Sequence, residues 1–263
     1  MSCTSLFSGF TASAVMINNV FNFTVRDSTF TNSFTLPLPE DHRGNAGGLT
    51  INYLEPPFLY SNALITNSLF EGNTAGVPNQ FFEIGSADAN QLGANSFSGQ
   101  FFGRGGGIGI FILDGKTVPI VNLTVEDCTI FNNTATGGGA GIYVAPFGDE
   151  INHFIVWRNC TIIKNLASEF GGGGHFGFPS FFTYPNKSTF LLEDVRFIDN
   201  SADIGGALSV FQAHLVGSGS LVTLRNCLIK GNTASTAAGI LFLSSAIILE
   251  FEASNYLYQI ENW

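Results

Sequence analysis

The side chains with the most evident chemical capacity are four aspartates and one histidine. Asp127 and Asp194 stand at equivalent places in two related segments, and Asp199 and Asp203 lie close together in the second of them. Two carboxyl groups around a water molecule would suit an inverting glycosidase, and clustered carboxylate oxygens would suit Ca²⁺. His175, which follows a run of glycines, would suit acid–base chemistry.

A structural role explains Asp127 and Asp194 more simply, because both fall at a corner of a repeating unit. Asp199 and Asp203 have no slot in the repeat, but the pair occurs in a single copy, which argues against a calcium site. His175 is expected in a loop. The glycine runs lack the Lys-Ser/Thr of a phosphate-binding loop, and the cysteines and histidines lack the spacing of metal ligands. We therefore predict no catalytic, cofactor-binding or metal-binding residues.

The repeating unit that would position these side chains is clearest in residues 193–208, which read EDVRFIDNSADIGGAL. An apolar anchor is followed by Asn three positions later and by Ala five positions later, and Gly-Gly comes after a short spacer. In a weak third copy Gln100 replaces the Asn. The anchors are Phe30, Phe70, Phe97, Ile130, Ile162, Phe197 and Ile229. A period of about 33 residues with elastic spacers is typical of a solenoid with insertions in its loops.

Short strands make up each unit. Apolar residues alternate over residues 190–192, two polar residues interrupt the alternation, and it resumes at Val195. Period-two runs rich in β-branched and aromatic residues indicate strands, and a polar pair that resets the phase indicates a corner. Stacking such units gives a parallel β-helix, in which equivalent residues of adjacent rungs lie about 4.8 Å apart.

Stacking also predicts ladders of equivalent residues. The anchors would form a core spine, and a line of asparagines would bond from rung to rung at a turn. These asparagines are Asn73, Asn133, Asn165, Asn200 and Asn232. At the corner, the residue type alternates between copies, which would place opposite charges side by side and avoid stacked carboxylates. The alternating residues are Glu126, Arg158, Glu193 and Arg225, followed by Asp127, Asn159, Asp194 and Asn226.

Three of the four cysteines share one slot of the repeat. Cys128, Cys160 and Cys227 are predicted to point inward, where a free thiol behaves as a small hydrophobic group. Cys128 and Cys160 lie in adjacent copies, so a disulfide between them is geometrically conceivable.

The composition narrows the class of protein. The 263 residues carry a net charge of −10 with ten Lys and Arg, and the lack of a basic cluster argues against a nucleic-acid partner. The longest apolar run, residues 237–249, is too short to span a bilayer, and no signal peptide is recognisable. Because the repeat runs nearly from end to end, we expect residues 1–263 to form one β-helix domain, a fragment of a longer extracellular protein.

With these motifs the chain resembles right-handed parallel β-helix proteins of the pectin-lyase-like superfamily. More narrowly, it is similar to the repeats of chlamydial polymorphic outer-membrane proteins and of some eukaryotic surface proteins. Their pattern joins Phe-x-x-Asn to Gly-Gly-Ala and an aliphatic residue, and residues 197–208 match it in full. The resemblance implies an all-β, single-stranded right-handed parallel β-helix of about seven or more rungs, extracellular or at the cell surface, membrane-associated and adhesive.

The predicted function is therefore non-catalytic: a surface scaffold for adhesion or ligand binding, with glycans or surface proteins as partners of the loops between repeats. Aromatic residues expected in or near these loops would either bind such partners or fold back over the solenoid. They are Phe101, Phe102, Phe176, Phe178, Phe181, Phe182 and Tyr184. The alternative is a polysaccharide lyase or glycoside hydrolase of the same fold, which an outward cluster of carboxylates without structural partners would favour.

Five Asn-x-Ser/Thr sequons permit N-glycosylation. Their asparagines are Asn22, Asn122, Asn132, Asn159 and Asn186. Since about as many are expected by chance at this composition, they do not establish that the protein is a glycoprotein.

Overall fold

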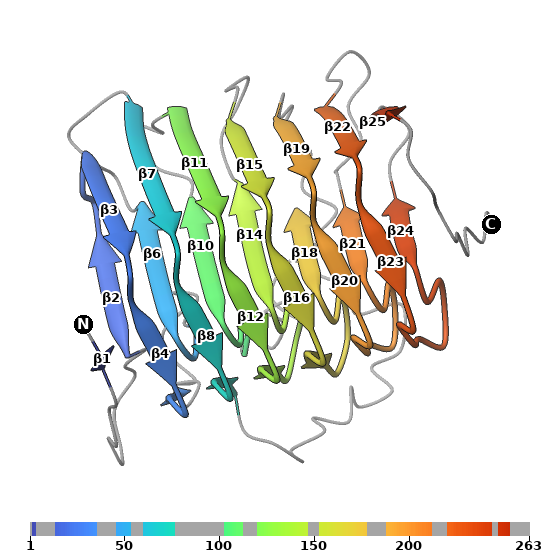
Figure 1. Ribbon diagram of the computed structural model, residues 1–263, viewed down its shortest axis with the longest axis horizontal. Coiled ribbons are helices and arrows are strands. Elements are labelled where there is room, and N and C mark those ends of the chain that lie inside the picture. The colour runs from blue at the N-terminus through green and yellow to red at the C-terminus, as the bar shows by residue number, and fades with distance from the viewer. Residues whose placement is uncertain are drawn as a thin grey trace, which may run out of the picture.

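The chain is an all-β parallel solenoid, as the repeat predicts. The computed structural model describes residues 2–3, 14–35, 46–53, 60–76, 103–112, 120–146, 153–177, 188–211, 220–243 and 247–252. Within these ranges the chain forms strands and no helix. The described strands assemble into four sheets whose pairings are parallel. Figure 1 shows the strands stacked side by side, in chain order from the N-terminus to the C-terminus.

Three of the sheets have seven described strands and one has four. Sheet A contains β1 (Ser2–Cys3), β4 (Thr29–Thr31), β8 (Leu69–Glu71), β12 (Thr129–Phe131), β16 (Thr161–Ile163), β20 (Arg196–Ile198) and β23 (Leu228–Lys230). Sheet B contains β2 (Val15–Asn18), β6 (Leu49–Tyr53), β10 (Ile108–Ile112), β14 (Ile142–Pro146), β18 (Gly174–Gly177), β21 (Leu208–Phe211) and β24 (Ile240–Leu243). Sheet C contains β3 (Asn22–Arg26), β7 (Tyr60–Thr66), β11 (Ile120–Glu126), β15 (Phe154–Arg158), β19 (Thr189–Glu193), β22 (Ser220–Arg225) and β25 (Ile247–Glu252). Sheet D contains β5 (Phe34–Thr35), β9 (Thr74–Ala75), β13 (Thr134–Ala135) and β17 (Leu166–Ala167).

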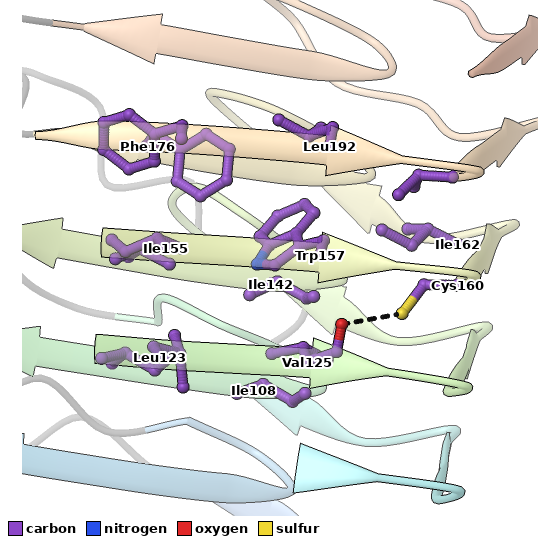
Figure 2. Close-up of a cluster of buried hydrophobic side chains, with 14 of the residues drawn as sticks. Ile108, Leu123, Val125, Ile142, Ile155, Trp157, Cys160, Ile162, Phe176 and Leu192 are labelled. Atoms are coloured by element: carbon purple, nitrogen blue, oxygen red, sulfur yellow. Dashed lines mark hydrogen bonds between the residues drawn. The ribbon is translucent and has the colours of Figure 1, made fainter. Parts of the chain in front are cut away.

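The core lies between the sheets and is made of inward-facing apolar side chains. Figure 2 shows one part of it, where Trp157 packs among aliphatic residues of several rungs. The predicted spine is present along sheet A: the rings of Phe30 and Phe70 stack with centroids 4.7 Å apart, and Ile162 pairs with Phe197. Burial of this continuous apolar column removes it from water and stabilises the stack of rungs.

One predicted copy of the repeat is wrong. Phe97 and Gln100 lie outside the described residues, and Phe70 pairs directly with Ile130, so no spine residue stands between these two anchors. The glycines at 105–107 belong to the same turn as Phe70, because Gly105 accepts a hydrogen bond from Gly47 and donates one to Gly138. The interval from Phe70 to Ile130 is therefore one rung step, where the sequence pattern predicted two.

The predicted asparagine ladder is confirmed, and it is saturated. The Nδ2 group of Asn133 donates to Phe70 O at 2.9 Å and to Asn165 Oδ1 at 3.0 Å. Asn165 repeats this arrangement with Ile130 O and Asn200 Oδ1. Because both amide hydrogens are used at each of these buried positions, the ladder satisfies polar groups that would otherwise be costly to bury.

The alternation at the corner is also confirmed, and it extends over six rungs. Residues of the Asp/Asn column have φ between 47° and 56°, a left-handed conformation that Asn and Asp tolerate better than most residues. They are Asp27, Asn67, Asp127, Asn159, Asp194 and Asn226. Asn159 Nδ2 donates to Asp127 Oδ1 at 2.7 Å, and Asn67 and Asn226 bond in the same way to the preceding aspartates.

The charged column beside this corner forms ion pairs from rung to rung. Arg158 Nε lies 2.8 Å from Glu193 Oε2, and Arg225 Nη1 lies 2.9 Å from Glu193 Oε1. Arg158 is also 3.8 Å from Glu126. The two arginines lower the pKa of Glu193 by hydrogen bonding to its carboxylate. The alternating charges thus support the observed register.

The cysteine slot points inward, as predicted. Cys128, Cys160 and Cys227 are buried and free, so the conceivable disulfide between the first two is not formed. Each thiol lies near backbone carbonyls of its own and the preceding rung, and Figure 2 shows the bond from Cys160 Sγ to Val125 O. Burial raises the pKa of Cys227 to about 11, so its thiol is unreactive.

Candidate functional site

The outer face of sheet C carries an open groove of about 480 Å³ near the N-terminal end of the solenoid. Strands β3, β7 and β11 form its floor, and their outward residues alternate with core residues along each strand. The groove is lined by Asn22, Phe23, Thr24, Asn62, Ala63, Leu64, Asn122 and Thr124. None of these lining residues is charged, so the site offers amides, hydroxyls and apolar surface.

Three asparagines form an exposed ladder in this groove. Asn22, Asn62 and Asn122 pair in register on successive rungs. Asn62 Nδ2 donates to Asn22 Oδ1 at 3.1 Å, and Asn122 Nδ2 donates to Asn62 Oδ1 at 2.9 Å. Asn22 Oδ1 also accepts from the backbone N–H of Asn62 at 3.1 Å, which uses both of its lone pairs. Each amide nitrogen carries two hydrogens, so the amide hydrogens outside these bonds and the second lone pair of Asn62 Oδ1 are left for a ligand.

Exposed aromatic residues flank the exposed asparagine ladder. Tyr60 lies two residues before Asn62 on the same face and is 51% exposed, with the ring of Phe21 packed edge-on against it at 5.1 Å. Phe154 pairs in register with Asn122 and is 49% exposed. Aromatic rings held beside amides can bind the apolar faces of a ligand while the amides bind its polar groups.

Four carboxylates on or beside the outer face of sheet C have structural partners. Glu126 and Glu193 belong to the ion-paired column, and Asp127 and Asp194 accept hydrogen bonds from asparagines at the corner. The suggested catalytic pair of Asp127 and Asp194 is therefore engaged in holding the rungs together. In the described part of the chain, no group of three or more His, Cys, Asp or Glu side chains could hold a metal ion.

Asp199, which the sequence analysis left without a structural role, has one. Its φ of 52° places it in the left-handed turn after the spine residue, and its carboxylate lies against Gly231 of the next rung. Asp203 is exposed, and its carbonyl accepts hydrogen bonds from Ser235 and Thr236.

A second cluster of polar residues lies on the other face of the solenoid, on sheet B. Tyr143, His175 and Ser209 are register neighbours on β14, β18 and β21. The guanidinium of Arg104 lies 5.1 Å from the ring centroid of Tyr143, and the Tyr143 and His175 rings stack at 5.2 Å. His175 Nδ1 is 2.7 Å from Ser209 Oγ. The distance between His175 and Ser209 would suit a base and its nucleophile.

Burial excludes hydrolytic chemistry for this pair. His175 and Ser209 are both 0% exposed, so no substrate can reach the hydroxyl. Burial, with the nearby charge of Arg104, lowers the pKa of His175 to about 3 and keeps its ring neutral. His175 is thus a buried member of a strand. The prediction of a loop histidine is wrong, because Gly174 begins a strand that the glycine run conceals.

Of the aromatic residues that the sequence predicts in or near loops, the structure describes Phe176. Phe176 is 1% exposed in β18 and packs in the core beside Phe190, where Figure 2 also places it. Of the two roles considered for it, binding a partner from a loop is therefore wrong, and its register partners Val144 and Val210 would have revealed its inward slot. The other predicted aromatics, at 101, 102, 178, 181, 182 and 184, lie outside the described residues.

The sequons separate into three groups. Asn22 and Asn122 lie in the groove, Asn132 and Asn159 are exposed at corners, and Asn186 lies outside the described residues. Asn159 donates its amide to Asp127. The sequence analysis named Asn22 and Asn122 only as sequons and missed their alignment with Asn62, although Asn recurs eight residues before each of three anchors, Phe30, Phe70 and Ile130.

The fold and these ladders define the class of protein, which is a parallel β-solenoid. Within it, residues 127–145 match the Chlamydia polymorphic membrane protein repeat, and the chain resembles that repeat family in both motif and parallel stacking. It is also similar to the metabotropic glutamate receptor-like protein R of Dictyostelium discoideum, with 26% identity over 147 residues. That similarity covers 49% of this chain and 8% of the relative.

No solved structure matches the chain. Across its described residues, there is no helix with the length and apolarity needed to cross a membrane.

Proposed function

We propose that this chain is a non-catalytic scaffold, extracellular or displayed at a cell surface, that binds a ligand or mediates adhesion through the outer face of sheet C. The observation that carries the proposal is the exposed ladder of Asn22, Asn62 and Asn122 in an open groove. Side chains fixed by rung-to-rung bonds bind with little loss of conformational entropy, which favours recognition by such a surface.

The similarities support the surface location. One is to a repeat of a membrane protein family, and the other is to a protein named as receptor-like. The rigid stack of rungs supports a display role, since a solenoid extends a surface over many repeats without needing a closed active site.

Structural partners at four carboxylates favour binding over polysaccharide cleavage: Glu126, Glu193, Asp127 and Asp194. A lyase or hydrolase of this fold would need outward acidic groups free to act on a substrate. Glu126 and Glu193 instead neutralise arginines. Incubation of the protein with polysaccharides should release neither reducing ends nor unsaturated products, and release of either would overturn the non-catalytic part of the proposal.

Adhesion is tested with fluorescent beads coated with the purified chain and offered to the cells and extracellular material of the producing organism. We expect the beads to attach, and beads carrying the double variant N62A/N122A to attach much less. The control is Asn18→Ala, which removes an exposed strand asparagine on sheet B, outside the groove. No attachment by the unaltered chain, or equal loss with the control, would count against the groove as the binding surface.

A further inference from the structure

We infer that the groove on sheet C binds a neutral, unbranched polysaccharide that lies along the solenoid axis, across the strands. This inference rests on the proposed function and names the ligand class and its direction. It follows from the chemistry of the lining, from the spacing of the exposed asparagine ladder and from the positions of two aromatic rings.

The lining selects a neutral ligand rich in hydroxyl groups. Asn62 and Asn122 present both donors and acceptors, as sugar hydroxyls do, and Asn22 presents donors, because its oxygen already accepts two bonds from Asn62. Thr24 and Thr124 add hydroxyls beside them. A carboxylate or phosphate ligand would need positive charge near its binding groups, and the groove lining contains no charged residue. The charged column, in which Arg26 and Glu126 stand on either side of Thr66, runs two residues further along the strands.

The spacing selects the direction. Across the strands, the same amide recurs at each rung, about every 4.8 Å, which is close to the length of one sugar unit in an extended polysaccharide. Along a strand, outward positions lie about 6.6 Å apart and change character, from Asn62 through Leu64 to Thr66. A repeating ligand therefore meets a repeating surface only if it runs along the axis.

The aromatic rings fit the same direction. Phe154 continues the amide column on the rung after Asn122, and Tyr60 stands beside Asn62 on the same face of β7. Both are about half exposed. From Asn22 to Phe154 the column spans three rung steps, about 14 Å, which is enough for roughly three sugar rings. The apolar face of a ring at the end of the ligand would pack on Phe154.

The test is calorimetric titration of the full chain, made in the bacterial cytoplasm so that the sequon amides of Asn22 and Asn122 stay unmodified. The probes are β-1,4-linked oligomers of glucose, mannose and N-acetylglucosamine, from one to six units, with oligogalacturonate as the charged comparison. We expect affinity for at least one neutral series to rise up to about three or four units and then level off, because the column is about 14 Å long.

Variants locate the binding. Asn62→Ala and Asn122→Ala should each lower affinity about 2- to 10-fold, the value of one neutral hydrogen bond, and Phe154→Ala should shorten the oligomer length at which affinity levels off. Asn18→Ala should leave affinity unchanged. Urea unfolding of each variant confirms that it is folded, and Asn62→Gln, which keeps an amide, serves as a milder second change.

The outcomes separate this inference from the proposed function. If beads attach through Asn62 but none of the neutral oligomers binds, the polysaccharide inference is overturned and the binding function stands; loss of attachment after protease treatment of the cells would then indicate a protein ligand. Tighter binding of oligogalacturonate would overturn the neutral class. Affinity that does not depend on oligomer length would overturn the axial direction.

Discussion

The buried asparagine ladder makes a quantitative prediction about stability, which Asn165→Ala tests most directly. The Asn165 side chain is 1% exposed. It donates to Ile130 O and Asn200 Oδ1, and it accepts from the backbone N–H and the Nδ2 group of Asn133. Truncation removes these bonds and leaves buried groups of Asn133 and Ile130 without their partner. At about 1 kcal/mol net per bond, the loss is about 3–5 kcal/mol.

Urea unfolding measures this loss. With a denaturant slope of about 3 kcal/mol/M, the midpoint should fall by roughly 1–1.7 M, while the slope stays constant. Asn62→Ala is the matched control, because it deletes the same group from an exposed rung position and should cost less than about 0.5 kcal/mol. Asn232→Ala, at a partly buried rung, should lie between the two. A midpoint for Asn165→Ala that matches the control would refute the reasoning.

Three further perturbations follow from the other ladders. Arg158→Glu replaces attraction to Glu126 and Glu193 by repulsion and should lower the melting temperature by a few degrees at low salt. The drop should be smaller at 1 M salt, where the Debye length is about 3 Å. As the control, Arg196→Glu should have little effect, because Arg196 lies between the neutral residues Thr161 and Leu228. His175 has a pKa of about 3 in the folded protein and about 6.5 when unfolded, so the unfolded state binds the extra proton. The free energy of unfolding should therefore fall as the pH drops below 6.5, by up to about 1.4 kcal/mol per pH unit. The urea midpoint of His175→Gln should depend less on pH between 6.5 and 5, and a pH dependence equal to that of the unaltered protein would contradict the assignment of this effect to His175. Gly171→Ala and Gly231→Ala both place Ala at positive φ, 59° and 67°. The added Cβ would meet the Gly174 carbonyl oxygen at 1.9 Å in the first and the movable Asp199 carboxylate in the second, so Gly171→Ala should lower the free energy of unfolding by about 2 kcal/mol more, and equal unfolding midpoints would argue against a rigid turn.

The parts of the fold that repeat could be predicted from the sequence, because each repeated slot imposes the same physical requirement on every rung. The segment from Phe197 to Asn200 shows this directly: the aromatic residue fills the core, and the amide bonds to its neighbours above and below. The alternation from Glu126 to Arg158 likewise predicted the register, since opposite charges must face each other across one rung.

The sequence predictions were wrong where the residue type at a repeated position differs from the pattern for a local reason. Position 174 points inward, and it is a glycine because an added Cβ would lie 2.8 Å from the Trp157 ring. The large Trp thus takes the volume of two side chains, and the glycine erases the period-two signal of the strand that holds His175 and Phe176. Phe97 was mistaken for an anchor for a different reason: Phe70 pairs directly with Ile130, and an aromatic residue between them in the sequence fell by chance near the expected period.

The groove on sheet C could not be predicted from the anchors, because it depends on which outward residues become neighbours. Asn22, Asn62 and Asn122 are separated by turns of unequal length, and only the pairing of Phe30 with Phe70 and of Phe70 with Ile130 fixes them in one column. The composition of an exposed face is also weakly constrained by folding, so its pattern carries little weight beside the core pattern.

The two asparagine ladders have the same side chain and the same rung spacing but differ in how many of their hydrogen bonds are made within the protein. In the buried ladder both hydrogens of Asn133 and Asn165 are bonded within the protein, so each amide contributes to stability and has nothing left to offer a ligand. In the exposed ladder, the bonds from Asn62 and Asn122 to the preceding rung fix the amides but do not saturate them. Because the exposed ladder contributes little to folding, its residues can be changed one at a time in a folded protein, and a loss of binding in Asn62→Ala can then be attributed to the groove itself.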